Sequence, residues 1–135
     1  MSGSPATTDT AALIESYFEA VQSGDRSVFE RLFADDITYH YPGKNPYAGV
    51  HQGKDEIFAY LDRLRDDTDG SLTVTVDEIL TGDGVAAALV RPRATRKGRV
   101  LEWSMVIFFR LAEGEIKQII LHYGDQYAFD SWASD

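Results

Sequence analysis

The chain changes its hydrophobic periodicity once, near residue 70, and this change restricts the folds that it can adopt. Before that point apolar residues recur every three or four positions, as in the stripe from Leu13 to Val21, which is the spacing of a helix face. After Ser71 the apolar residues come in runs of strand length, separated by short segments that contain glycine. A helical half followed by a strand-rich half predicts an α+β fold.

Three helices are predicted in the first half. The first runs to Gly24, which supplies a helix stop, and Asp25 can cap a second, short helix that ends at Asp35 and Asp36. A third is predicted over residues 54–66, where apolar residues return at helical spacing.

Between the second and third helices we expect one strand and one loop. Ile37–Tyr41 is β-branched and aromatic, which predicts a short strand that ends at Pro42 and Gly43. Residues 42–53 hold two prolines and three glycines, which is typical of a loop.

Four strands are predicted in the second half, over residues 72–80, 85–95, 100–111 and 116–124. The turns between them are short, so neighbouring strands should pair as antiparallel hairpins. Val85–Val90 and Met105–Phe109 are apolar at almost every position, whereas a sheet with one wet face should alternate. Three short helices can cover one face only, so we expect the other face to meet a second copy in a homodimer.

Composition narrows the possible functions. The 135 residues include no cysteine and carry a formal net charge of −9. This length suits a single domain over residues 11–135, after a small, polar N-terminal segment, residues 1–10, that is expected to be a flexible tail. The acidic balance argues against nucleic acid and anionic membranes as partners. Without a signal peptide or an apolar run of about 20 residues, a cytoplasmic location is expected.

Motifs for metals and cofactors are missing from the sequence. The absence of cysteine excludes a thiol nucleophile and a cysteine-ligated zinc, and the three histidines lack metal-ligand spacing. Asp66–Gly70 fails the calcium-loop template, because Arg65 takes its first position and Val76 its last. No phosphate-binding loop, dinucleotide fingerprint or nucleophile elbow occurs. We therefore expect neither a metal nor a cofactor.

Several short motifs follow one another in an order that can be compared with known families. They are Tyr17-x-Glu19-x-Val21-x-x-Gly24-Asp25, Phe33-Ala-Asp-Asp36, a strand that ends at Pro42-Gly43, Gly49 and Gly53 before the third helix, Arg96-x-Gly98-Arg99, Trp103, Glu113-Gly114-x-Ile116 and Asp125-Gln-Tyr-Ala128. In this order the chain resembles the SnoaL-like and ketosteroid isomerase-related members of the nuclear-transport-factor-2-like superfamily. The resemblance implies a cone-shaped α+β barrel. In such a barrel three N-terminal helices pack on a strongly curved, mixed, mainly antiparallel sheet around an internal cavity.

Comparison with the isomerases gives one matching residue and two departures. Tyr17 occupies the position that, in those enzymes, supplies a phenol to an oxyanion hole. Tyr41 stands where the resemblance places the carboxylate base, before Pro42, and Ile107 stands where it places a second, acidic donor. Steroid isomerisation by that mechanism is therefore not expected.

The resemblance also implies which side chains form the cavity wall. These are Tyr39, Tyr41, Trp103, Met105, Ile107, Ile119, Leu121 and Tyr123 from the strands, and Phe58 from the third helix. Such an aromatic, apolar wall suits a flat or polycyclic hydrophobic small molecule.

A general base must come from another residue type, because phenols are weak bases at pH 7. The candidates are His40, His122 and Asp125. Strict strand alternation turns both histidines to the outer, dimer-facing side unless a bulge redirects one of them inward. Asp125 has two interpretations: it orients a histidine, or it caps the turn that follows the last strand.

A basic hairpin and a group of C-terminal aromatic residues each have two interpretations. Five cations in one hairpin, Arg91, Arg93, Arg96, Lys97 and Arg99, either discourage edge pairing or form a positive rim for a substrate carboxylate or a carrier phosphopantetheine. The C-terminal aromatics Tyr127, Phe129 and Trp132 form a lid over the cavity or pack against the partner subunit.

The sequence and the resemblance leave two possible functions, which belong to different classes. The first is a cofactor-independent acid–base enzyme for a hydrophobic small molecule, of the isomerase, cyclase, dehydratase (lyase) or epoxide hydrolase type, as in natural-product biosynthesis. Tyr17 would donate to the oxygen that gains charge, His40 or His122 would be the base, and Asp125 the orienting residue. The alternative is a non-catalytic small-molecule-binding or dimeric assembly module of the same fold.

Overall fold

The computed structural model describes residues 4–134, and the side chains of residues 10–134. Its elements are, in order, α1 (Ser4–Ser23), α2 (Arg26–Leu32), β1 (Phe33–Tyr41), β2 (Gly49–Gln52), α3 (Gly53–Asp67), β3 (Thr73–Gly82), β4 (Val85–Arg96), β5 (Arg99–Glu102), β6 (Met105–Ala112), β7 (Glu115–Tyr123) and α4 (Gln126–Ala133). Helix α1 begins inside the segment that we expected to be a tail.

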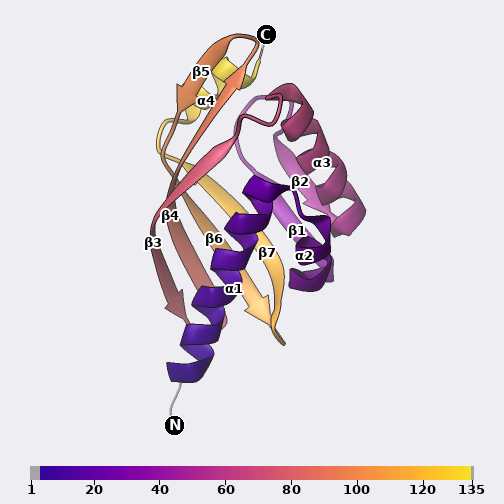
Figure 1. Ribbon diagram of the computed structural model, residues 1–135, viewed down its shortest axis with the longest axis vertical. Helices are drawn as coiled ribbons and strands as arrows, with labels where there is room; N and C mark the ends of the chain where they lie inside the picture. The colour runs from indigo at the N-terminus through magenta and orange to yellow at the C-terminus, as the bar shows by residue number, and fades with distance from the viewer. Residues whose placement is uncertain (1–3, 135) are drawn as a thin grey trace.

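One curled sheet holds all the strands, in the order β2-β1-β7-β6-β4-β3, with β5 paired to β4 (Figure 1). Strands β1 and β7 are parallel, and the other neighbouring pairs are antiparallel. Helix α1 packs against β3 and α3 against β1, so these helices cover the concave face. The predicted α+β fold with a mixed, mainly antiparallel sheet is confirmed, although α4 adds a fourth helix to the three that were expected.

The core lies between the concave face and the helices. Strand alternation turns Phe109, Ile119 and Leu121 inward, and each is at most 1% exposed. Ile14 and Tyr17 of α1 meet them from the helix side, because they lie on the buried stripe of that helix. Within residues 4–134, none of the helices combines the length and apolar character needed to cross a bilayer.

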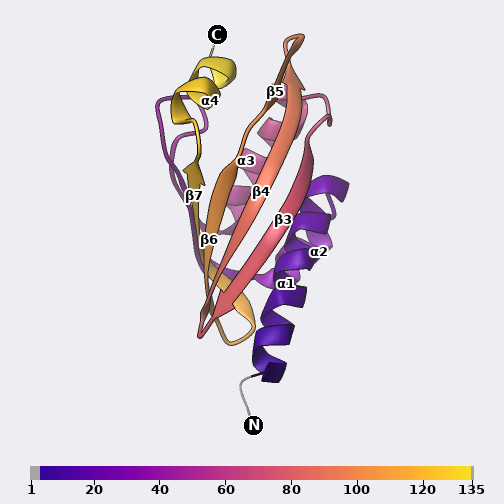
Figure 2. The same ribbon diagram turned by 90° about the vertical axis from the view of Figure 1, so that its left-hand side faces the viewer.

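The opposite face of the sheet carries a row of mainly apolar residues. The strand registers place Ala87, Phe108, Ile120, His40 and Val50 side by side across five strands. In Figure 2 this face of β4 and β6 points toward the viewer and α3 lies behind it. Val50 is 53% exposed, so part of this row is open to solvent.

The boundary between the second helix and the first strand differs from the prediction. Helix α2 ends at Leu32, where the Phe33 N–H donates to the Phe29 carbonyl and the chain turns extended. Phe33 then pairs with Ile116 of β7 and is fully buried. The prediction that the helix reaches Asp36 is wrong, because Phe33 fits the helical stripe and a buried strand equally well and tertiary pairing decides.

The structure also differs from the prediction in two further segments, one predicted as a loop and the other as a single continuous strand. Residues 42–53 contain β2, which pairs with the end of β1. The strand predicted over residues 100–111 is divided into β5 and β6 at Trp103 and Ser104. The division lies opposite Pro92, whose nitrogen has no hydrogen to donate to the ladder, although its carbonyl still accepts from the Trp103 N–H at 3.0 Å.

Candidate functional site

A pocket lies inside the curled sheet, between its concave face and helices α1 and α3. We call it the inner pocket. Its free volume is about 40 Å³, room for a few water molecules and not for a polycyclic ligand unless side chains move. The lining residues are Tyr17, Phe18, Val21, Tyr39, Tyr41, Leu61, Leu64, Leu72, Val74, Pro92, Trp103, Met105 and Ile107.

Two phenols form a hydrogen-bonded pair in this pocket. The Tyr17 and Tyr39 hydroxyl oxygens lie 2.8 Å apart, and both rings are at least 97% buried. Burial, and then the neighbouring Tyr39, raise the pKa of Tyr17 well above its usual value. Burial also raises the pKa of Tyr39 to about 12, although the Tyr17 hydrogen bond works against this shift. Both groups are therefore neutral at physiological pH, so one hydroxyl donates to the other and the second hydrogen is available to a ligand oxygen.

Two further donors are buried beside this pair without a partner. The Tyr60 hydroxyl and the Trp103 indole Nε1 form no hydrogen bond with any described residue, although their residues are only 5% and 8% exposed. The Tyr60 ring lies 4.5 Å from the Tyr41 ring, which places it against the pocket wall. Burial, and then Tyr39, Tyr123 and Tyr17, raise the pKa of Tyr60. A buried donor without a partner costs about 1–3 kcal/mol, so these groups are suited to an acceptor that the chain itself does not supply.

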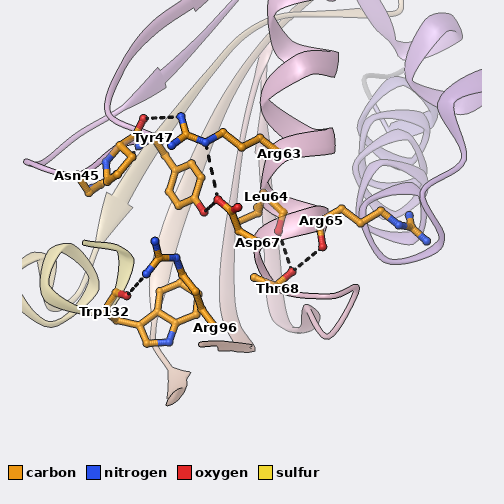
Figure 3. Close-up of polar contacts among 10 residues, drawn as sticks. Asn45, Tyr47, Arg63, Leu64, Arg65, Asp67, Thr68, Arg96 and Trp132 are labelled. Carbon is orange, nitrogen blue, oxygen red and sulfur yellow. Dashed lines mark hydrogen bonds and ion pairs between the residues drawn. The ribbon is translucent and has the colours of Figure 1, made fainter. Parts of the chain in front are cut away.

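A second group of polar side chains, which ranges from buried Tyr47 and Arg96 to exposed Arg63, lies where α3, α4 and the end of β4 meet (Figure 3). We call it the polar cluster: Tyr47, Arg63, Asp67, Arg96 and Trp132. The Tyr47 hydroxyl donates to the Asp67 carboxylate, and the Arg96 guanidinium donates to the Trp132 carbonyl at 3.2 Å. Burial, and then Asp67, raise the pKa of Tyr47 to about 12. These contacts join the loop before β2, α3, β4 and α4, so the cluster holds elements together.

Five of the nine predicted wall residues line the inner pocket: Tyr39, Tyr41, Trp103, Met105 and Ile107. Ile119 and Leu121 are buried in the core beneath the wall. Tyr123 packs on Phe129 of α4, with ring centroids 4.4 Å apart. Phe58 lines a different space, which also borders α1 and α2.

The three candidate bases are all found outside the inner pocket. His40 lies on the outer face, with its Nε2 3.2 Å from the Gln118 amide nitrogen. His122 is exposed and shares an open hollow with His40 on that face. Asp125 is the N-cap of α4, where its carboxylate accepts from the Ala128 N–H at 3.0 Å. Strand alternation therefore accounts for the outward position of both histidines, and helix capping accounts for the position of Asp125.

The cations of the basic hairpin have several different roles. Arg91 forms a two-bond ion pair with Asp77. Arg96 and Arg99 both donate to the Trp132 carbonyl at 3.2 Å, so they tie β4 and β5 to α4. The aromatic residues of α4 join the same contacts: Trp132 and Phe129 pack on Trp103, with ring centroids 5.5 and 5.1 Å away.

Acidic and imidazole side chains in the described part of the chain are not gathered into a metal site. Within the described residues there is no group of three or more His, Cys, Asp or Glu side chains that could hold a metal ion. The lining of the inner pocket, in that same part of the chain, includes no carboxylate and no imidazole. Its chemistry therefore rests on hydroxyl and indole donors.

Comparison with known proteins identifies the family. Residues 14–119 match the sequence profile of the SnoaL-like domain. The chain belongs to the SnoaL-like family. The uncharacterized protein Rv0034 of Mycobacterium tuberculosis is 36% identical over 123 residues, which cover 90% of this chain and 94% of the relative. The uncharacterized protein Mb0035 of Mycobacterium bovis matches equally well.

Solved structures share the fold of this SnoaL-like chain. Bal32a, from a soil-derived mobile gene cassette, has a TM-score of 0.91 and 27% identity, covering 94% of this chain and 98% of Bal32a. A putative SnoaL-like polyketide cyclase from Jannaschia has a TM-score of 0.81 at 15% identity over 100% of this chain and 99% of the other. IdmH, a putative polyketide cyclase from Streptomyces antibioticus, has a TM-score of 0.74 at 19% identity, covering 90% and 96%. The last two likenesses concern the fold alone.

Sequence reasoning missed Tyr60 and the polar cluster. Tyr60 lies at helical spacing from Ile57 and Leu64, so the buried stripe of α3 was a usable signal for it. The pairing of Tyr47 with Asp67 and the burial of Arg96 left no such signal, because the three residues come from separate elements and meet only in the folded chain.

Proposed function

We propose that this chain is a cofactor-independent enzyme of the cyclase or isomerase type, acting on a hydrophobic small molecule that carries at least one oxygen acceptor. The substrate's oxygen would lie among the donors of the inner pocket. Its apolar part would lie against Trp103, Met105 and Ile107.

One observation carries the proposal: Tyr60 Oη and Trp103 Nε1, two buried donors beside the inner pocket, have no hydrogen-bond partner among the described residues. A chain that only needed a packed core would gain stability from apolar groups at these two places. A substrate carbonyl or hydroxyl would supply the missing acceptor. The neighbouring Tyr17–Tyr39 pair offers a further hydroxyl hydrogen to the same oxygen.

The donors define the kind of chemistry that we propose. Neutral phenol and indole donors in a site without bulk water stabilise negative charge that develops on a carbonyl oxygen. Among the described lining residues there is no carboxylate or imidazole to remove a proton. We therefore propose ring closure within one molecule held in a folded conformation, in which an enol carbon of the substrate forms a bond to a carbonyl carbon. The C=O π bond breaks, the enol becomes a ketone and its O–H proton passes to the former carbonyl oxygen, so that no protein base is needed.

A second candidate function is binding without conversion. The absence of a base from the described lining favours it. The two functions share the ligand class and differ only in whether the bound molecule changes. Incubation of the protein with a polyketone that can cyclise, followed by product analysis, distinguishes them, because a binder returns the polyketone at the uncatalysed rate.

A pair of probes of equal shape tests the ligand class. Acetophenone has a carbonyl oxygen where α-methylstyrene has a methylene group, so their apolar areas are similar and only one of them accepts a hydrogen bond. We expect acetophenone to bind about fivefold more tightly in calorimetry, since one hydrogen bond contributes about 1 kcal/mol. Tyr60→Phe combined with Trp103→Phe should remove most of this preference, and Trp132→Phe should not. Equal affinities in the unaltered protein would contradict the proposal.

We also propose that two copies associate through the outer face of the sheet. The support is a mainly apolar row that the described helices leave uncovered: Ala87, Phe108, Ile120, His40 and Val50. A twofold axis would bring this row against its own copy and bury its apolar side chains. Light scattering after size-exclusion chromatography should give the mass of a dimer. Ile120→Glu should give a monomer, and Tyr127→Glu, at an 84% exposed position of α4, should not. A monomeric mass for the unaltered chain would refute the interface.

A further inference from the structure

A second space adjoins the inner pocket, and we call it the side groove. It lies where the end of α1, the start of α2, α3 and the chain before β3 come together (Figure 1). Its free volume is about 70 Å³, larger than that of the inner pocket. The lining residues are Val21, Gln22, Gly24, Arg26, Phe29, Phe58, Leu61, Asp62, Leu64, Arg65, Thr68, Gly70 and Leu72.

The same four aliphatic side chains line both spaces: Val21, Leu61, Leu64 and Leu72. All four are only partly buried. They pack against the core and form the wall between the side groove and the inner pocket, and a partly buried aliphatic side chain changes rotamer at a lower cost than a fully buried one. A molecule longer than the inner pocket therefore has a route through this wall into the side groove.

The mouth of the side groove is more basic than the rest of this acidic chain. Arg26 forms an ion pair with Asp62 at 2.8 Å and its guanidinium lies over the Phe58 ring, 4.7 Å from the centroid. Arg65 has no acidic partner among the described residues. Two guanidiniums and one carboxylate line the groove, so one positive charge stays uncompensated there.

The position of Arg65 depends on Gly24. This glycine ends α1 with φ at +75°, and a Cβ built on it would lie 1.7 Å from Nη1 of Arg65. The guanidinium thus lies across the end of α1 in the space that a side chain would fill. In Figure 3 Arg65 extends away from Asp67 and the polar cluster, so the two charged regions of α3 are separate.

We propose that the side groove is the outer part of the ligand site and binds the carboxylate end of a hydrophobic ligand. This rests on the proposed function, because the oxygen-bearing apolar part of the same ligand occupies the inner pocket. The planar guanidinium of Arg65 suits a carboxylate, which can accept two of its hydrogen bonds. The substrate class is accordingly an aromatic or aliphatic keto acid, with its carboxylate several carbon atoms from the ketone.

A ketone extended by a carboxylate tests this assignment. The probes are 5-oxo-5-phenylpentanoate, which is acetophenone with a three-carbon chain ending in a carboxylate, and its methyl ester. We expect the acid to bind about tenfold more tightly than the ester in calorimetry at low salt, and this advantage to shrink at high salt. Arg65→Gln should remove the advantage and leave the affinity for acetophenone unchanged. Arg110→Gln is the matched control, because it removes the same charge from an exposed side chain that lies over Phe108.

The outcomes separate this inference from the proposed function. If acetophenone is preferred over α-methylstyrene but the acid binds no better than the ester, the side-groove assignment is overturned and the proposed function stands. The assignment is also overturned if Arg65→Gln and Arg110→Gln weaken the acid equally. If Arg65→Gln abolishes a real preference for the acid while acetophenone and α-methylstyrene bind alike, the carboxylate site stands and the proposed function fails. If no probe binds, both are overturned.

Discussion

The two tryptophans of this chain lie in contact and differ in one hydrogen bond. Their ring centroids are 5.5 Å apart. The Trp132 indole N–H donates to the Arg99 carbonyl at 2.8 Å, whereas the Trp103 indole N–H has no partner. Tyr47 and Tyr60 repeat this contrast: their ring centroids are 5.8 Å apart, the Tyr47 hydroxyl donates to Asp67, and the Tyr60 hydroxyl has no partner.

This contrast separates two uses of buried polar aromatic residues. In the polar cluster every such donor has an acceptor from another element, so the hydrogen bonds fix the positions of α3, α4 and β4. At the inner pocket the donors at Tyr60 and Trp103 were left without acceptors. Under the proposed function, the satisfied donors hold the fold together and the unsatisfied ones are those that a ligand would engage.

The largest effect on stability is expected in the polar cluster. Arg96→Met removes a 6% exposed guanidinium and its hydrogen bond to the Trp132 carbonyl. We expect the free energy of unfolding to fall by about 2–3 kcal/mol in urea denaturation. Arg110→Met, at an exposed position, should change it by less than about 0.5 kcal/mol. Equal losses of the free energy of unfolding in the two variants would contradict a structural role for the polar cluster.

Removing the hydroxyl group of Tyr47 and removing that of Tyr60 should change the stability of the protein in opposite directions. Tyr47→Phe leaves the Asp67 carboxylate without the hydroxyl donor and should cost about 1–2 kcal/mol. Tyr60→Phe removes a hydroxyl that bonds nothing and should leave stability unchanged or raise it by up to about 1 kcal/mol. Thermal unfolding of both variants checks this. A clear loss of stability in Tyr60→Phe would mean that its hydroxyl has a partner in the ligand-free protein.

High pH should destabilise both regions. The pKa values of Tyr39 and Tyr47 are raised from 10.0 to about 12 in the folded chain, so the folded state holds these protons more tightly than the unfolded state. Their contribution to stability is complete below pH 10 and is lost as the pH rises through about 12. The free energy of unfolding, measured from pH 8 to 12, should fall in that window, and less steeply in Tyr39→Phe. A flat profile would contradict the burial of these phenols.

The smallest effect is expected at the outer-face histidines. His40→Gln and His122→Gln should each leave the affinity for acetophenone, and any turnover, within about twofold of the unaltered protein, because neither side chain lines the inner pocket. A large loss of turnover in either variant would restore that histidine as the base.

Sequence patterns were reliable where a single element decides the outcome. The resemblance put Tyr39 on the cavity wall, and strand alternation then turned His40 to the opposite face, where the structure has it. Tyr17 also lines the pocket, at the position that the resemblance marked. Phe33 fits a helix or a strand, and its pairing with Ile116, more than 80 residues away, decided for the strand. Strand β2 is only four residues long and forms only beside β1, so its own sequence gave little sign of it.

The site was harder to predict because it depends on partners. That Tyr17 and Tyr39 share a hydrogen bond follows from the meeting of α1 and β1. That Trp103 has no partner whereas Trp132 has one follows from where β5 ends and where α4 packs. A sequence shows which donors exist, and only the folded chain shows which of them remain unsatisfied.

The most direct test of the central claim uses the indole N–H signals of the two tryptophans in a proton–nitrogen correlation spectrum. Trp103→Phe assigns the two signals. On addition of acetophenone the Trp103 signal should move downfield, as its N–H gains an acceptor, and the Trp132 signal should move much less because Arg99 already supplies one. α-Methylstyrene should produce no such downfield shift. If the Trp103 signal stays in place while acetophenone binds, or if both signals move alike, the unpartnered donors do not mark the ligand site.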